Sequence, residues 1–193
     1  MNRWVAAAIS FFFAAGLLAQ DDKKKNDFTD KDNGFYIAKP PKNDAWDVKT
    51  DTKKLNNSLV SVAHRIDDIA VEVFFQKQNK QQPLNLDPKE SAKNEIKGQE
   101  EGKTKGDYKE VKVKESAKEV NFPGDGGAKA QYFTLVIKDK NDKEFEWHEY
   151  IFLSKANGGQ YRVFILCAPG ELEKKKKEVD VILGSFKSFK LPK

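Results

Sequence analysis

Three residues that could ligate a metal alternate along one predicted strand. Glu144, Glu146 and His148 occur at every second position of the segment KEFEWHEYIFL. Because side chains of a strand alternate between its two faces, these three share one face, and the rings of Phe145 and Trp147 occupy the other. The three could bind a divalent metal if a neighbouring strand supplied a fourth ligand. The alternative is a solvated strand face whose carboxylates and imidazole pair with lysines.

Other residues with reactive side chains lack a catalytic pattern. His64 shares a predicted face with Val60 and Val62, which favours a buried structural histidine over a general base. The GDGG segment at 124–127 lacks the Gly-Lys-Ser/Thr ending of a phosphate loop. Cys167, the only cysteine, lies in an apolar strand and should behave as a small hydrophobic residue. We therefore predict no catalytic residues and no cofactor; among the functions considered, a hydrolase with a dispersed site ranks last.

The last third of the chain contains the element that must organise the rest. Residues 161–168 are apolar at nearly every position, and only Arg162 interrupts them. A strand that is apolar on both faces is covered on both faces, so it should lie centrally in a sheet. Pro169-Gly170 ends it.

An amphipathic helix follows this strand, and Gly184 should end it. Lys174–Lys177 should lie on its outer face, either solvated or in contact with an acidic partner or an anionic lipid surface. Its apolar stripe consists of Leu172, Val179, Ile182, Leu183 and Phe186.

The upstream sequence predicts strands and one further helix. A peripheral helix should begin at Pro88 after the N-cap Asp87, with its length limited by Gly98 and Gly102. In a predicted hairpin, residues 59–66 and 69–76, Ile66 should share a strand face with Val60, Val62 and His64. The remaining predictions are short strands at 35–38 and 46–49, an edge strand near 108–113, and an antiparallel meander over 131–168.

These elements predict an α+β fold with a central antiparallel β-sheet sandwiched between helices. The predicted organisation is a signal peptide at 1–19, a flexible lead-in at 20–33 and a single domain at 34–193. Arg3 precedes an apolar run that is too short to span a bilayer comfortably, which is typical of a secretory leader. We therefore expect an extracytoplasmic protein, periplasmic or secreted, with no transmembrane anchor after cleavage.

The charge and the single cysteine narrow the possible partners and the source of stability. The chain has 35 Lys and Arg against 30 Asp and Glu, a net charge of +5, and the charges of both signs are mixed. A nucleic-acid-binding protein would instead gather basic and aromatic residues on one face. One cysteine cannot form an internal disulfide, so the core must supply the stability.

The order of motifs resembles the PsbP-like superfamily, which includes the extrinsic PsbP proteins of the photosynthetic oxygen-evolving complex and bacterial periplasmic DcrB-type proteins. The resemblance covers roughly residues 34–190. It rests on Gly-aromatic-x-Ile-x-x-Pro from Gly34 to Pro40 followed by Trp46, on Gly-x-x-Ala at 127–130, and on the YRVFILCAP strand, the helix and the ILGSFK ending.

This resemblance implies an antiparallel sheet between helices and no shared catalytic residues. It also implies a non-enzymatic binding or assembly role outside the cytoplasm, with another extracytoplasmic protein or an envelope component as partner. The alternative function is a small-ligand or divalent-metal-binding extracytoplasmic protein that uses Glu144, Glu146 and His148.

Overall fold

The computed structural model describes residues 26–50, 58–76 and 87–191, and the predicted signal peptide lies outside these ranges. Alternating apolar residues build most of its strands. The helices are α1 (Pro88–Thr104) and α2 (Glu171–Ser185). The strands are β1 (Asp27–Asp30), β2 (Phe35–Ala38), β3 (Trp46–Lys49), β4 (Val60–His64), β5 (Ile69–Gln76), β6 (Glu110–Asn121), β7 (Lys129–Lys138), β8 (Glu144–Leu153), β9 (Gln160–Cys167) and β10 (Lys187–Ser188).

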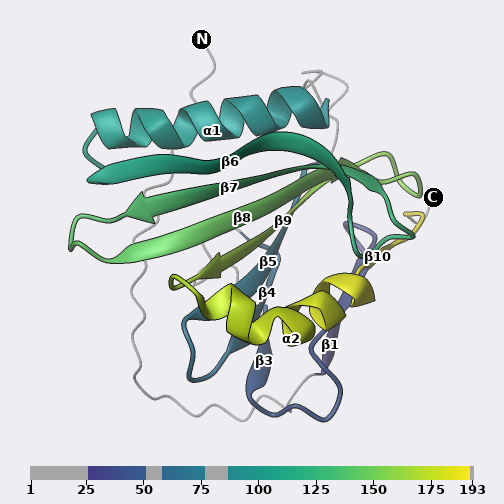
Figure 1. Ribbon diagram of the computed structural model, residues 1–193. Coiled ribbons are helices and arrows are strands. Elements are labelled where there is room, and N and C mark those ends of the chain that lie inside the picture. The colour runs from purple at the N-terminus through teal and green to yellow at the C-terminus, as the bar shows by residue number, and fades with distance from the viewer. Residues whose placement is uncertain (1–25, 51–57, 77–86, 192–193) are drawn as a thin grey trace.

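Seven strands form one antiparallel sheet in the order β3-β4-β5-β9-β8-β7-β6 (Figure 1). The predicted hairpin and meander are both present, and β9 lies between β5 and β8 as its apolar sequence indicates. Tyr161, Val163 and Ile165 belong to the hydrophobic core on one face. Phe164 and Leu166 belong to the core on the other face. The sheet therefore has two buried faces, which meet at β9.

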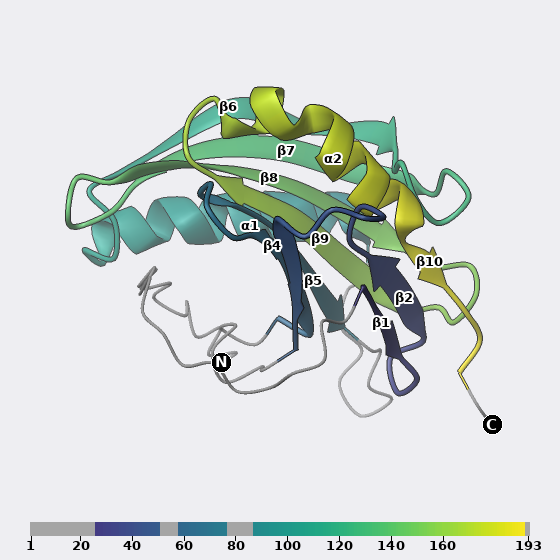
Figure 2. The same cartoon turned by 90° about the horizontal axis from the view of Figure 1, so that it is seen from below.

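One helix lies on each face of this sheet (Figures 1 and 2). On one face, α2 buries Val179, Ile182 and Leu183 in the core that also contains Tyr161, Val163 and Ile165 of β9. On the other face, α1 lies over β6, β7 and β8. It buries only Ala92 and Gly102, so much of its attachment must come from polar contacts.

The expected sheet between two helices is confirmed only in part. The antiparallel sheet and the two helices are present, but a second sheet of order β1-β2-β10 shares the face covered by α2. Phe35 of this small sheet stacks on Phe186 at 5.7 Å between ring centroids and meets the edge of Tyr161 at 5.8 Å. Helix α2 therefore does not cover its face of the large sheet alone.

Several predicted boundaries differ from the structure. Residues 27–30, placed in the lead-in, form β1. The first helix continues through Gly98 and Gly102 to Thr104, because Gly102 lies against the ring of Tyr108 and a Cβ there would approach it to 3.1 Å. The edge strand begins after Tyr108 and extends to Asn121.

The face predicted for Ile66 is wrong, since Val60, Val62 and His64 are buried whereas Ile66 is 85% exposed. The strand ends at His64, and the backbone N–H of Arg65 then donates to the carbonyl of Ala45 at 2.7 Å. The chain turns away at this point, so the period-2 alternation no longer specifies which side chain faces the core.

The GDGG loop holds the C-terminal end of α2. A Cβ on Gly124 would lie 2.3 Å from the carbonyl oxygen of Leu183 and 2.8 Å from that of Phe186. The N–H of Asp125 donates to the Phe186 carbonyl at 2.8 Å, and its carboxylate accepts from the N–H of Ser188 at 2.7 Å. The loop faces the carbonyl end of a helix, which repels anions, so its position supports the structural interpretation.

Candidate functional site

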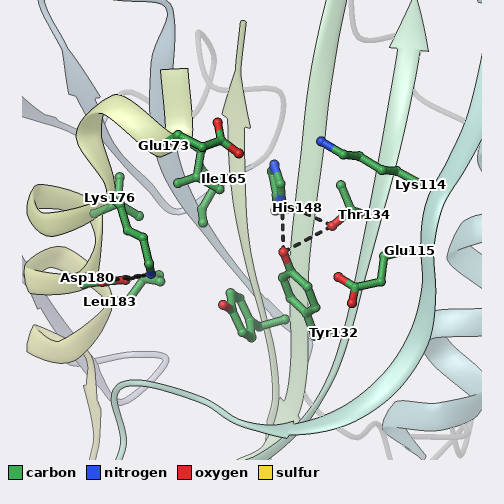
Figure 3. A pocket seen from close by; sticks show the side chains of 13 residues that line it. Lys114, Glu115, Tyr132, Thr134, His148, Ile165, Glu173, Lys176, Asp180 and Leu183 are labelled. Carbon is green, nitrogen blue, oxygen red and sulfur yellow. Dashed lines mark hydrogen bonds and ion pairs between the residues drawn. The ribbon is translucent and has the colours of Figure 1, made fainter. Parts of the chain in front are cut away.

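A pocket of about 480 Å³ lies on the α2 side of the sheet, between that helix and β6, β7 and β8. One row of paired residues forms its floor: Glu115 pairs with Thr134, Thr134 with His148, and His148 with Ile165. Helix α2 supplies the opposite wall through Glu173, Lys176 and Asp180 among others (Figure 3). The site therefore stands on four adjacent strands and one helix, which are rigid supports.

His148 is the most constrained polar side chain on the floor of this pocket. It is 5% exposed. Its Nδ1 lies 2.9 Å from the Tyr132 hydroxyl and 3.2 Å from Thr134 Oγ1, and its Nε2 lies 3.2 Å from Glu146 Oε2 (Figure 3 shows the first two contacts). Burial lowers the pKa of His148, and the neighbouring Glu146 only partly opposes this. The ring is therefore neutral near pH 7.

Glu146 lies two residues before His148 on the same strand face and is only 6% exposed. Its Oε1 accepts a 2.6 Å hydrogen bond from Lys114 Nζ on β6, whose side chain is half exposed. Burial alone would raise the pKa of Glu146, but the hydrogen bonds from Lys114 and His148 outweigh it and hold the pKa below its usual value. The same hydrogen bond raises the pKa of Lys114. Glu146 is thus an ionised carboxylate that contacts Lys114 through one oxygen and His148 through the other.

Cys167 joins this pair from β9. It is the cross-strand partner of Glu146, and donor atoms of Glu146, His148 and Cys167 all lie within 4.8 Å of one another. Burial, with the nearby Glu146 carboxylate, raises the pKa of Cys167 to about 12. At neutral pH the group is a buried thiol, which agrees with the sequence interpretation of Cys167 as a small hydrophobic residue.

The three residues predicted as metal ligands are separated by exposure. Glu146 and His148 are buried together, whereas Glu144 lies at the exposed beginning of β8. The residue whose donor atom lies close to those of Glu146 and His148 is Cys167, not Glu144. Sequence reasoning missed Cys167 because the relevant signal, its register opposite Glu146, exists only once the strands are paired. Metal binding by these residues stays a prediction.

His64 occupies a different polar cluster near the beginning of α2. Its Nδ1 accepts from the N–H of Asp67 at 3.0 Å, and its Nε2 lies 3.4 Å from Lys175 Nζ. Lys175 in turn pairs with the Asp67 carboxylate at 2.9 Å, and the edge of the imidazole meets the Trp46 ring at 5.1 Å. These contacts connect β3 and β4 to α2 and give His64 a structural role.

A second buried polar network lies on the α1 side of the sheet. Arg162 donates from Nε to Glu149 at 2.6 Å and pairs through Nη2 with Glu95 of α1 at 2.8 Å. Trp147 Nε1 donates to the other Glu149 oxygen at 2.9 Å. Burial raises the pKa of Glu149 against the opposing charge of Arg162. Arg162, the residue that interrupts the apolar run of β9, thus attaches α1 to the sheet.

Comparisons with known proteins give a match at the level of structure. No protein-family model and no curated protein matches the sequence. The solution structure of cyanobacterial PsbP (CyanoP) from Synechocystis sp. PCC 6803 superposes with a TM-score of 0.54 at 14% identity, over 91% of this chain and 99% of that one. The chain has a PsbP-like fold. The expectation drawn from the sequence resemblance is confirmed at this level.

Two further solved structures are similar. A crystal structure of a protein from Bacteroides thetaiotaomicron VPI-5482 has a TM-score of 0.49 at 10% identity, over 86% of this chain and 49% of that one. The crystal structure of LpqN, involved in cell envelope biogenesis of Mycobacterium tuberculosis, has a TM-score of 0.49 at 12% identity, over 79% of this chain and 82% of that one. Across the described residues, no helix combines the length and apolar character needed to traverse a bilayer.

Proposed function

We propose that this chain is an extracytoplasmic, non-catalytic binding module that holds a protein or an envelope component at the pocket beside α2. The pocket itself is the observation that carries this proposal. It presents cations, Lys114 and Lys176, and anions, Glu115 and Glu173, on strands and a helix that cannot easily move apart. Mixed charge on a rigid surface favours recognition of a specific polar partner. The secretory leader predicted at 1–19 and the PsbP-like fold support a location outside the cytoplasm.

A binding role fits the pocket better than hydrolysis does. Thr134, His148 and Glu146 form a chain of hydroxyl, imidazole and carboxylate that outwardly resembles a catalytic triad. However, Thr134 is 2% exposed, and it shares the same imidazole nitrogen with Tyr132. A nucleophile must reach its substrate, so this hydroxyl is poorly placed for attack. The arrangement instead fixes the His148 ring in one orientation.

A small ligand is the second candidate for the same pocket. The volume of about 480 Å³ lies within the range typical of small-molecule sites. Lys176 pairs with Asp180 at 3.0 Å on one wall, and Lys114 pairs with Glu146 at 2.6 Å on the other side, so a ligand with both a cationic and an anionic group would exchange these ion pairs for its own. Native mass spectrometry of the protein purified from its source would detect such a ligand as a constant added mass.

Site-specific photo-crosslinking in the source cells tests the main proposal. A photoreactive amino acid in place of Lys176, on the pocket wall, should capture one extracytoplasmic protein or envelope component. The matched control replaces Lys97, an exposed lysine of α1 on the opposite face of the sheet, and should capture nothing at the same level. Equal capture from both positions, no capture from either, or recovery of the chain in the cytoplasmic fraction would contradict the proposal.

A further inference from the structure

We propose that Glu146, His148 and Cys167 form a binding site for a zinc-type divalent cation, held by one carboxylate oxygen, the imidazole Nε2 and the Cys167 thiolate, whose proton is released to solvent as the ion binds. These residues come from the neighbouring strands β8 and β9, and all three are buried. The site lies under the pocket described above but does not depend on the proposed partner. It replaces the exposed Glu144 of the sequence prediction with a sulfur ligand.

The distances between the donor atoms suit a small tetrahedral ion. Two ligand atoms that each lie about 2.0–2.1 Å from a tetrahedral zinc ion are roughly 3.3 Å apart. The observed separation of His148 Nε2 and Glu146 Oε2 is 3.2 Å. All three donor atoms lie within 4.8 Å of one another. With zinc–sulfur bonds of about 2.3 Å, the sulfur would lie roughly 3.6 Å from each other ligand atom, so the site closes with a movement of at most on the order of 1 Å.

Hydrogen bonds around the donors hold the His148 ring and the Glu146 carboxylate in place. Without a metal, Nε2–H of His148 donates to Glu146; metal binding requires the other tautomer, in which Nδ1–H donates to the hydroxyl oxygen of Tyr132 or Thr134 and the Nε2 lone pair faces the ion. Lys114 holds Glu146 through Oε1, so Oε2 stays on the His148 side. Such outer contacts fix ligand orientation in established zinc sites. The lysine therefore need not leave when the ion binds.

The pocket supplies access and a fourth coordination position. His148 lines both the pocket and the proposed site. Figure 3 shows Glu173, on the first turn of α2, and Lys114, on β6, on the two sides of the His148 ring. A water molecule that enters from the pocket can complete the set.

The donor set selects the class of metal. Nitrogen, sulfur and a single oxygen suit zinc and cobalt, whereas magnesium and calcium require shells of oxygen. Burial of Glu146, His148 and Cys167 also excludes the many waters that magnesium retains. A site of this kind should therefore discriminate strongly against the two alkaline-earth ions.

Cobalt spectroscopy on the purified protein tests the inference. Titration with Co²⁺ should produce one bound ion per chain and a thiolate-to-cobalt charge-transfer absorption, and Zn²⁺ should displace the cobalt. This absorption is read on the unaltered chain, so the test does not depend on the folding of a variant. Cys167→Ser should abolish the band, and His148→Gln should weaken binding at least about 100-fold, the upper range found for supporting residues alone.

Matched variants separate this site from adventitious binding. Glu144→Gln removes the exposed carboxylate two residues from Glu146, and His64→Gln removes the other histidine; both should leave the affinity and the absorption band unchanged. Absence of binding at micromolar metal would overturn the inference. Cobalt binding without the charge-transfer band, or loss of binding in Glu144→Gln, would overturn it as well. Each of these results would leave the crosslinking test of the proposed partner unaffected.

Discussion

At the scale of single residues, Glu72 of β5 controls part of the pH dependence of stability. Its side chain lies among Ser61, its cross-strand partner on β4, and Phe164, its partner on β9. Burial raises its pKa to about 7, although hydrogen bonds from Ser58 and Ser61 oppose the change. The folded state therefore binds more protons than the unfolded state between about pH 4.5 and pH 7. Its contribution to stability is largest at low pH and is lost as the pH rises through that window.

Glu72→Gln should remove this loss. A neutral amide keeps an acceptor for the serine hydroxyls and has no charge to bury. We expect the variant to be more stable than the original chain at pH 8 by about 3 kcal/mol and nearly equal to it at pH 4.5, since the pKa of Glu72 is raised from 4.5 to about 7 and one pKa unit corresponds to about 1.4 kcal/mol. Urea unfolding at the two pH values measures this difference, with Glu144→Gln as an exposed control. An unchanged dependence on pH would show that Glu72 is solvated.

For the residues of the candidate site, the sequence predicted which face of its strand each side chain occupies, but not which side chains meet. Period-2 alternation correctly placed Glu146 and His148 on one face of β8 and Trp147 on the other. It could not show that Glu144 is exposed or that Cys167 lies opposite Glu146, because exposure depends on the strand's end and register depends on pairing. The sequence showed that Arg162 interrupts an apolar strand. It could not show the ion-pair partners of Arg162, because they lie on β8 and α1.

At the scale of elements, α2 depends on a narrow apolar stripe. Ile182 is fully buried, and its neighbour Val181 is 46% exposed. Ile182→Ala should lower the free energy of unfolding by about 2–5 kcal/mol, since it removes buried methyl groups and leaves a cavity. Val181→Ala, the matched control, should change it by less than about 0.5 kcal/mol. Chemical denaturation followed by circular dichroism distinguishes the two; equal effects would mean that the helix does not pack as described.

Two glycines should respond in opposite directions to alanine. Gly98 lies inside α1, and no atom lies within 4 Å of the position that an alanine methyl group would take there, so Gly98→Ala should stabilise the protein by about 0.5–1 kcal/mol. A methyl group on Gly124 would lie 2.3 Å from the backbone carbonyl oxygen of Leu183. Gly124→Ala should therefore destabilise the contact between the loop and α2. Thermal unfolding of the two variants checks the sign, and a stabilising Gly124→Ala would contradict the docking of this loop.

The elements themselves were largely predictable, because their patterns are local. The strands at 35–38 and 46–49 match the structure residue for residue. The first helix was predicted too short, since Gly98 and Gly102 lower helix propensity while Tyr108 stabilises the last turn by packing there. Ile66 was misplaced because alternation continues in the sequence after the strand has ended. Tertiary contacts decided both cases.

At the scale of the whole molecule, a buried ion pair attaches α1 to the sheet. Arg162 balances Glu149, which is fully buried, and also reaches Glu95 of the helix. Arg162→Met should cost about 3–5 kcal/mol, because it leaves Glu149 as an unpaired buried charge. Adding Glu149→Gln to this variant should recover much of the loss, since the amide can still accept from Trp147. If the double variant were less stable than Arg162→Met, measured by urea unfolding, the proposed origin of the loss would be wrong.

The arrangement of helices and sheets places the functional site on one side of the molecule. The PsbP-like fold supplies a rigid sheet, and a fold of this kind can support unrelated functions. In this chain, the polar groups on β6, β7 and β8 line the pocket beside α2. Both the proposed partner and the proposed metal site use this side, whereas the network on the α1 side is structural.

Anomalous X-ray diffraction at the zinc absorption edge, from crystals grown with Zn²⁺, tests most directly whether this is the functional side. We predict one strong peak bounded by Glu146 Oε2, His148 Nε2 and Cys167 Sγ, next to the first turn of α2. A map with no peak among these three residues, or with its strongest peak at the exposed Glu144, would contradict the account.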